Sequence, residues 1–395
     1  MRIFAQILAL SAMGIRTLPN RLGSSTVVVV GITGVVTVLI SVLAMSRGFV
    51  HALQATAMED RAIVVRTGAS GELTSLLSYE ATRVIANAAG IKKGVNGITL
   101  VSPEALTSIN LRKSDGTDGD APLRGLMPWG LAVHPEIRLL EGRSYQEGLP
   151  ELMVGRAAQR LFRGLRPGSQ LTFGGTTWTI VGVFESAGSA RESELITDAR
   201  MLNSVFQREN IFQSVLVILE SPASFAAFKS SVTTNPQLQV DSFRERDFRT
   251  QQSERIDSLL ADLAYVVGGI MAAGAMFGAL NSMYSAVSAR SREIATLRAI
   301  GFGPLPVLVS IVGEALLLAC VGGVLGIALA WGLFNGYSVN TAGGGLGGQV
   351  VFDLAVTFNL SMIGFAWAAV IGLVGGLFPA VRGARLTIAA ALRAL

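Results

Sequence analysis

The chain has 395 residues, of which half are hydrophobic and only 15% are charged. An average soluble domain carries about 25% charged residues, so this composition excludes an ordinary soluble protein and indicates a membrane protein. The net charge of +5 is no sign of nucleic-acid binding, which needs basic side chains clustered on one face.

Residues 1–25 are predicted to form a cytoplasmic amphipathic lead, with a disordered tail as the alternative. Residues 26–46 follow as the first transmembrane helix. Within them, Val27–Met45 is a run of 19 residues without a charge, close to the roughly 20 that span the hydrocarbon core. The run is longer than the apolar core of a signal peptide, which favours an uncleaved anchor.

Residues 47–255 are predicted to form a large extracytoplasmic α+β domain that ends in a helical stalk. Short apolar runs predict strands, and runs with a 3.6-residue period predict helices. The expected strands are 62–66, 98–101, 171–173, 176–184 and 214–220. The expected helices are 73–88 and 222–232, with a polar loop at 113–122 and charged helix from 243 to 260. Gly174-Gly175 predicts a tight hairpin turn.

No catalytic set is visible in this domain. The chain has two histidines, His51 and His134, which excludes a site built from several histidines. Neither H-E-x-x-H nor G-x-S-x-G occurs, so a catalytic triad through His134 has no local support. We therefore expect no catalytic, cofactor-binding or metal-binding residues.

The last third of the chain is predicted to cross the membrane three more times. The expected helices are 258–287, 305–334 and 358–380. Between them lie a short amphipathic helix at 288–303 and a loop at 335–357, and the tail is 381–395. Six of the thirteen residues from Gly336 to Gly348 are glycine, which places the loop there.

Basic residues set the predicted orientation. They flank the first, second and fourth membrane helices at residues 1–25, 288–303 and 381–395, whereas the glycine-rich loop carries none. The positive-inside rule then places both termini and the short helix in the cytoplasm. Residues 52–254 carry 21 basic and 22 acidic side chains, so the basic excess of the chain lies in these flanks.

The short helix carries the residues expected to couple the chain to a partner. Ile294, Leu297 and Ile300 fall along one side as an apolar edge, and Gly301 ends the helix. Arg290, Glu293 and Arg298 are polar residues around that edge. The edge either docks into a partner protein, which makes Leu297 more important than Arg298, or rests on lipid headgroups, which reverses that order.

Small residues and one acid stand out within the membrane helices. Three Gly-x-x-x-Gly motifs predict close packing within a bundle or a dimer, and their residues are Gly274, Gly278, Gly322, Gly326, Gly372 and Gly376. Glu314 is the one ionisable residue well inside a span. It is either a proton or substrate site, or a structural polar anchor bonded to groups such as Asn281 or Ser282.

Four stretches resemble the MacB/FtsX-like ABC permeases. E-I-A-T-L-R-A-I-G at 293–301 is similar to their cytoplasmic coupling segment, and residues 311–326, with Glu314, are similar to their third membrane helix. L-F-P-A-V-R-G-A-R at 377–385, continued to Arg393, is similar to their C-terminal signature. Residues 139–145, 154–158 and 177–184 resemble their MacB-type periplasmic domain. The signature residues here are Pro379, Arg382, Arg385 and Arg393. Ile388 and Gly383 depart from the usual Pro and Ala.

The resemblance implies the permease subunit of an ABC transporter in a bacterial inner membrane. It implies a second permease copy, identical or homologous, and a cytoplasmic ATPase that binds the ATP, since the chain lacks G-x-x-x-x-G-K-[ST]. In this family, ATP hydrolysis moves the periplasmic domain by mechanotransmission to export or extract a substrate. A periplasmic adaptor and membrane lipid are further expected partners, and nucleic acid is not.

Two other functions stay open at this stage. A sister branch of the family recruits and activates a cell-wall hydrolase instead of transporting a substrate. A membrane-anchored enzyme is the third possibility, and it would need His134 or an acid pair to be catalytic.

Overall fold

The computed structural model describes residues 22–94, 97–208, 210–341 and 349–385, together with Gln6 and Leu10. The chain divides into two compact units. The helical unit comprises residues 1–47, 258–337 and 354–395, and the α+β unit comprises residues 48–257 and 338–353. The predicted fold class, four membrane helices with an α+β domain between the first two, is confirmed.

The helical unit is built from long apolar helices. Their bounds are α2 Leu22–Gln54, α7 Glu245–Ala289, α9 Pro304–Phe334 and α10 Phe358–Arg385, with the short α8 Ser291–Ala299 between α7 and α9. Each of the four long helices has the length and hydropathy to cross a membrane. Most of the predicted N-terminal lead, residues 342–348 of the glycine-rich loop and residues 386–395 lie outside the described residues.

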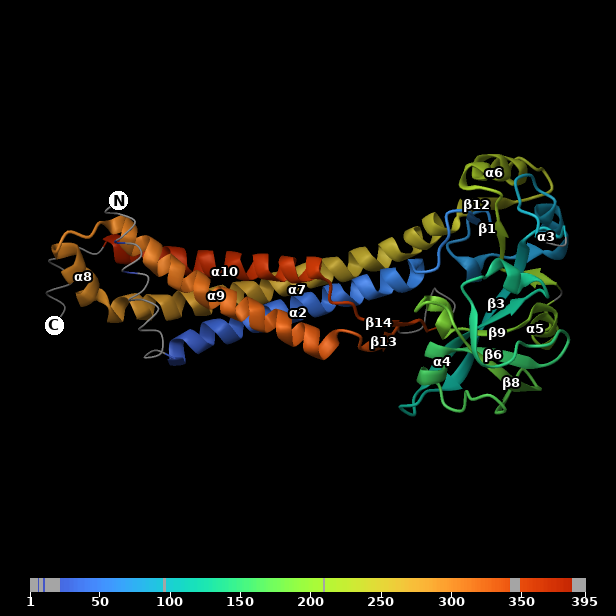
Figure 1. Cartoon of the computed structure of the whole chain (residues 1–395), viewed down its shortest axis with the longest axis horizontal. Coiled ribbons are helices and arrows are strands. Elements are labelled where there is room, and N and C mark those ends of the chain that lie inside the picture. Colours follow the sequence, from blue (N-terminus) through green and yellow to red (C-terminus); the bar gives the residue numbers. More distant parts are fainter. Residues whose placement is uncertain are drawn as a thin grey trace. The chain divides into compact units, whose positions relative to one another are not determined.

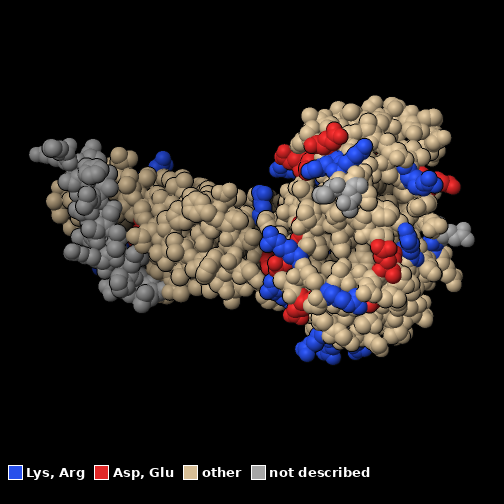
Figure 2. Space-filling model, turned by 45° about the vertical axis from the view of Figure 1, so that its right-hand side comes forward, with Lys and Arg blue, Asp and Glu red and all other residues tan. Residues whose placement is uncertain are grey.

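The four long helices run alongside one another (Figure 1), with a shared apolar core. Ile32 and Val36 of α2, Ala272 of α7, Ala319 of α9 and Ala368 of α10 all belong to it. In Figure 2 almost all the visible charged side chains lie on the α+β unit, and the visible surface of the helical unit is nearly uncharged. Such a surface suits helices that face lipid.

The α+β unit is organised around one ten-stranded sheet of order β12-β1-β11-β3-β4-β9-β6-β8-β5, with β7 on β8. Its pairs are antiparallel except for β4–β9 and β6–β8. The strands are β1 Arg61–Arg66, β3 Val101–Arg112, β4 Asp118–Leu126, β5 Arg138–Gly142, β6 Glu151–Gly155, β7 Gln170–Phe173, β8 Thr176–Glu185, β9 Leu195–Asp198, β11 Ser214–Ile218 and β12 Val240–Arg244. A separate pair joins β2 Leu77–Ser78 to β10 Ile211–Phe212.

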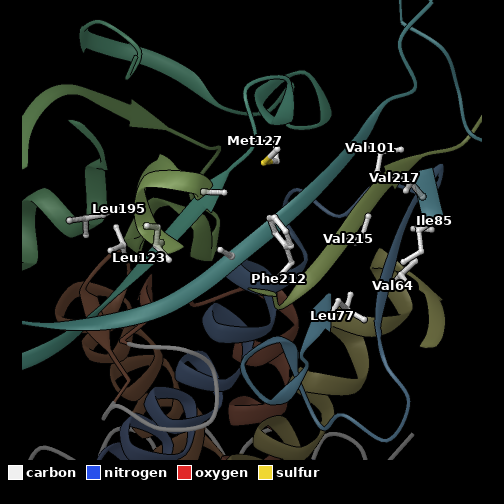
Figure 3. Packing of buried hydrophobic residues seen from close by; sticks show 14 of the residues in the cluster. Val64, Leu77, Ile85, Val101, Leu123, Met127, Leu195, Phe212, Val215 and Val217 are labelled. Carbon is white, nitrogen blue, oxygen red and sulfur yellow. The ribbon is translucent and has the colours of Figure 1, made fainter. Parts of the chain in front are cut away.

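Short helices cover this sheet. They are α3 Tyr79–Ala86, α4 Arg156–Leu161, α5 Ala199–Val205 and α6 Phe225–Thr233, with 3₁₀ turns η2 Glu72–Thr74, η3 Gly130–Val133, η4 Ala190–Ser193 and η5 Pro222–Ser224. Apolar side chains from β1, β3, β4, β9 and β11 meet beneath them in one core (Figure 3), among them Leu123, Leu195 and Val215. The α+β unit therefore has a hydrophobic core of its own, built by strands such as β1, β6, β9 and β11 that are buried along nearly their whole length.

Several local predictions are confirmed. The hairpin forms as β7 and β8, and its turn residues Gly174 and Gly175 have φ values of 60° and 73°. These positive values are those of a primed turn, which glycine adopts without strain. The strands predicted at 62–66 and 214–220 are β1 and β11, and the charged helix runs on without a break as α7.

Other predicted bounds are wrong. The helix expected at 73–88 begins only at Tyr79, because Leu77 pairs with Phe212 in the small sheet. The strand expected at 98–101 begins at Val101 and runs to Arg112. Polar residues such as Thr107 interrupt the apolar pattern from which a strand would be predicted. The polar loop expected at 113–122 is a turn closed by a 2.7 Å hydrogen bond from Lys113 N to Thr117 O, after which β4 begins.

The glycine-rich loop contains structure that the sequence did not reveal. Its two ends form β13 Ser338–Asn340 and β14 Val351–Asp353, which pair with each other. Gln349 N donates to Asp120 O over 2.8 Å, and Val351 N donates to Ser193 Oγ over 2.8 Å. This part of the loop therefore belongs to the α+β unit.

Candidate functional site

The segment between α7 and α9 folds as α8, which contains Glu293, Ile294, Leu297 and Arg298 of the predicted coupling residues. Arg290 and Ile300 are its N-cap and C-cap residues. Gly301 follows it with a φ of 104°, a left-handed conformation that favours glycine. Gly303 and Pro304 then begin α9, with proline at a position where its missing N–H costs nothing. The signals that end one helix and begin the next, Gly301 and Pro304, thus separate α8 from α9 by a short turn.

One face of α8 is already packed inside the helical unit. Ile294 is only 7% exposed, whereas Ile300 is 72% exposed. Leu297 is half-buried and packs against the same cluster as Ile294. That cluster contains Leu10, Met283, Val287, Val307, Ile311, Ala315 and Ala380. The expectation of one free apolar edge is therefore wrong, because positions i, i+3 and i+6 spread around the helix and only Ile300 stays available.

The opposite face of α8 is open and mostly polar. Arg292, Glu293, Thr296 and Ile300 are exposed, and we call these four residues the outer face of α8. Arg298, which the sequence placed at the rim, is half-buried instead. A single exposed isoleucine among polar side chains is a surface that another protein can cover.

The structure joins two residues that the sequence treated separately. Arg290 Nη1 lies 2.8 Å from Glu314 Oε2, so the residue that precedes α8 is tied to α9 by an ion pair. Both side chains are largely buried, at 14% and 7% exposed. The sequence did not name this partner for Glu314, and the carboxylate reaches the guanidinium that precedes α8. This pairing favours the structural interpretation of Glu314.

A small cavity lies beneath α8. Its volume is about 50 Å³, and Arg290, Glu293, Ser310 and Glu314 line it together with apolar residues of α7, α8 and α9. A polar-edged space of this size can hold a water molecule that bridges such groups. The cavity is part of the same junction and does not form a separate site.

Two of the three glycine motifs pack within the chain. A Cβ at Gly326 would lie 2.8 Å from Val36 Cβ, and one at Gly322 would lie 3.0 Å from Ile32 Cβ. Thr33 Oγ1 and Thr37 Oγ1 donate hydrogen bonds to the carbonyl oxygens of Gly322 and Gly326, over 3.1 and 3.2 Å. The small residues thus let α9 approach α2 closely enough for these bonds.

The glycine motifs of α10 and α7 differ from each other. A Cβ at Gly372 or Gly376 would meet Ala319 or Ala315 of α9 at 2.4 and 2.5 Å, so α10 packs closely on α9. Nothing lies within 4 Å of a Cβ at Gly274 or Gly278 among the described residues. The motif of α7 therefore has no packing role within the described part of the chain.

The C-terminal signature lies at the end of α10. Pro379 is buried inside the helix, and Arg382 lies over the ring of Tyr284, 5.6 Å from its centroid. A Cβ at Gly383 would be 3.0 Å from Ile311 Cδ1, so the smaller residue suits its tight surroundings. Arg385 is exposed, and Arg393 lies outside the described residues.

A network of buried charges in the α+β unit was missed from the sequence. At its centre Arg124, 2% exposed, binds three carboxylates. Its nitrogens lie 2.8 Å from Glu72, 2.6 Å from Glu104 and 2.7 Å from Glu194. Burial alone would raise the pKa of Glu72, but Arg124 and Arg249 outweigh it and lower that pKa to about 2.

His134 belongs to this network. Its Nε2 lies 2.6 Å from Glu104 Oε1 and its Nδ1 lies 3.2 Å from Glu136 Oε1. The side chain is buried, and both ring nitrogens face carboxylates. Neither nitrogen is left to activate a nucleophile, which removes the basis for an enzyme that uses His134.

The network also holds the start of α7. Arg61 Nε lies 2.5 Å from Glu245, and Arg61 Nη2 donates to Thr56 O, just after α2, over 2.8 Å. Arg249, one turn after Glu245, lies 2.7 Å from Glu72. The first turns of α7 and the residues that follow α2 are thus fixed to the sheet through buried ion pairs.

The sequence held one weak signal for this network. Arg124 interrupts an apolar run that is otherwise typical of a buried strand, Arg61 directly precedes another, and a buried arginine needs a partner. The partners lie at distant positions, from Glu72 to Glu245, so their pairing follows only from the order of strands in the sheet.

Comparison with known proteins gives two family matches. Residues 25–235 match the MacB-like periplasmic core domain, and residues 265–388 match the FtsX-like permease C-terminal domain. The first match alone covers more than half of the chain. The second includes α8 and all of its packing partners named above except Leu10.

Similar proteins agree with these matches. The macrolide export ATP-binding/permease protein MacB of Hyphomonas neptunium is 23% identical over 98% of this chain. The pyoverdine export ATP-binding/permease protein PvdT of Pseudomonas putida is 36% identical over 36% of this chain. The chain spans 61% of the former and 19% of the latter, less than two thirds of either.

Among solved structures, the periplasmic region of MacB from Actinobacillus actinomycetemcomitans is similar to part of the chain. The match covers 51% of this chain and 95% of that one, at 14% identity and a TM-score of 0.38.

Proposed function

The chain belongs to the MacB/FtsX-like ABC transporter permeases, and from that premise we propose that it is the membrane subunit of an exporter driven by a separate cytoplasmic ATPase. Its four long apolar helices make it a multi-pass membrane protein. The 395 residues contain no G-x-x-x-x-G-K-[ST] motif, which supports our proposal that a partner subunit binds the ATP and that these residues hold no cofactor.

The proposed location is a bacterial inner membrane with both termini and α8 in the cytoplasm. The support is the positive-inside rule, since Arg290 precedes α8, Arg292 and Arg298 lie on it, and the glycine-rich loop has no basic residue. The α+β unit then lies outside the cytoplasm, where an adaptor protein and the cargo can reach it.

One observation carries the proposal: α8 is fixed to its own chain on one side and exposed on the other. Ile294 packs against α7, α9 and α10, and the Arg290–Glu314 pair ties the start of α8 to α9. Ile300 and its polar neighbours stay open. An ATPase that docks on the outer face of α8 and moves it would therefore shift α7 and α9 together.

The path from α8 to the α+β unit supports mechanotransmission. α7 is one unbroken helix from Glu245 to Ala289, so its two ends move as parts of one element. Glu245 and Arg249 at its start are held in the buried network of the α+β unit. Movement of α7 thus reaches the sheet through ion pairs and needs no substrate channel through the membrane.

The cargo and the remaining partners belong to the proposal too. The names of the two relatives describe export of a macrolide and of pyoverdine, two chemically different molecules, so the cargo of this chain is left at a peptide, a lipid or lipoprotein, or a small molecule. A second permease copy would complete the transporter, and the open Gly274 and Gly278 of α7 offer it a surface.

Co-purification tests the proposal. An affinity-tagged chain purified from its own host should retain an ABC ATPase, and Ile300→Asp should release that ATPase because a charge replaces the exposed apolar side chain. Leu140→Asp is the matched control, since Leu140 is also exposed but lies on β5 of the α+β unit. Failure of the unsubstituted chain to retain any ATPase would refute the function, and retention of a cell-wall hydrolase would favour the regulatory alternative.

A further inference from the structure

The α+β unit contains an open groove that the export proposal does not use. Its volume is about 720 Å³, within the range of small-molecule sites. The lining comes from the residues that follow α2, from β5, from α4 and from the turn after β8. The charged residues that line it are Glu136, Arg138, Arg156, Arg160, Glu185, Glu192 and Asp353.

The carboxylates of this groove already have partners. Glu136 pairs with Arg61 at 3.0 Å. Glu192 Oε1 accepts hydrogen bonds from Ser186 N and Gly188 N, each over 2.8 Å. Glu185 lies 3.6 Å from Arg156. Asp353 accepts a hydrogen bond from Ser338 Oγ.

Two of the three arginines that line the groove, Arg138 and Arg160, have no ion-pair partner of this kind, since no carboxylate among the described residues lies within ion-pair distance of either. Both side chains are exposed, Arg138 from β5 and Arg160 from the last turn of α4. Glu192 and Asp353 keep their charge, but backbone N–H groups or a hydroxyl already bond to them, whereas the two guanidinium groups have no carboxylate partner among the described residues.

We propose that this groove binds an anionic group, a phosphate or a carboxylate, between Arg138 and Arg160. A guanidinium presents two parallel N–H donors that match the oxygens of such a group. Ala55, Ala57 and Met58 line the same groove, so the ligand carries an apolar part beside its anionic one. A phospholipid headgroup and a soluble organic anion both have this chemistry.

Binding by the purified full-length chain in detergent tests the site. The probes are short-chain phosphatidylglycerol, short-chain phosphatidylcholine and inorganic phosphate, measured by calorimetry. Phosphatidylglycerol should bind, and Arg138→Gln/Arg160→Gln should weaken it at least about tenfold, since each charge-assisted hydrogen bond is worth roughly that factor. Arg83→Gln/Arg112→Gln is the control, with two exposed arginines of the same unit that do not line the groove.

The outcomes separate the sources. Phosphatidylglycerol bound at least tenfold more tightly than inorganic phosphate supports a lipid headgroup, and equal binding of both supports a soluble anion. The site is refuted if neither anion binds, if phosphatidylcholine binds as well as phosphatidylglycerol, or if the control pair loses as much affinity. None of these results depends on an ATPase, so the site and the proposed function can fail separately.

Discussion

At the scale of single residues, Arg124 shows how ion pairs offset the desolvation cost of a buried charge in the α+β unit. Its guanidinium replaces lost water with three carboxylates, and each of those has a further partner. A buried ion pair is weak evidence for net stability, but breaking one is costly because it leaves a buried charge alone. The network therefore fixes one arrangement of β4, η2 and the start of α7.

We expect Arg124→Met to destabilise the α+β unit by about 3–5 kcal/mol, because it removes the cation that three buried carboxylates share. Urea unfolding can be followed by the fluorescence of Trp178, which is fully buried in this unit, after the other three tryptophans are replaced by phenylalanine. Arg246→Met is the control, since Arg246 pairs with Glu59 at the surface and should change the midpoint little. Equal shifts in both variants would contradict the role of burial.

The lowered pKa of Glu72 predicts how stability depends on pH. Its ordinary value is 4.5 and its folded value is about 2, so the ionised carboxylate stabilises the fold above pH 4.5. That contribution, on the order of 3 kcal/mol, is lost as the pH falls from 4.5 toward 2. The same Trp178 assay should show this loss in the unsubstituted chain and a smaller one in Glu72→Gln. Parallel pH profiles for the two chains would count against the assignment.

At the scale of elements, glycine sets how closely the membrane helices approach. Gly326 lets Val36 and the carbonyl oxygen of Thr33 come to 2.8 and 2.9 Å from where a Cβ would stand. We expect Gly326→Val to cost about 1–3 kcal/mol by overpacking, measured as thermal unfolding in detergent. Gly332→Val on the same helix has open space and should change the melting temperature of the chain little. The interpretation fails if both variants melt alike.

The membrane helices and α8 could be predicted from the sequence because each is encoded locally. An uncharged run of sufficient length gives a span, and Gly301 with Pro304 stops one helix and starts the next. The face that α8 uses could not be predicted. Whether Ile294 or Ile300 stays exposed depends on how α7, α9 and α10 surround the helix, and no local pattern records that.

The buried network and the strands of the glycine-rich loop escaped prediction for the same reason. Arg61 meets Glu245, and Ser193 meets Val351, across more than 150 residues of sequence. Such contacts follow from the topology of the sheet and from nothing in the neighbouring residues. The Arg290–Glu314 pair is shorter in range, yet it too needed the turn between α8 and α9 to be known.

At the scale of the whole molecule, the proposed exporter works as a series of fixed junctions. In this proposal the outer face of α8 binds the ATPase, the Arg290–Glu314 pair transmits its movement to α9, and α7 transmits it to the network around Glu245. Each junction is an ion pair or a packed core, which transmits displacement because its parts have few alternative arrangements.

The ATPase rate of the purified complex tests this proposal most directly, in a cycle of Arg290→Glu, Glu314→Arg and the double exchange. Each single reversal places two like charges together at a largely buried site, so we expect the permease-stimulated rate to fall at least about tenfold. The double exchange restores the pair and should recover most of that rate. If the single reversals leave the rate unchanged, or if the double exchange recovers none of it, the Arg290–Glu314 pair does not couple ATP hydrolysis to the membrane helices.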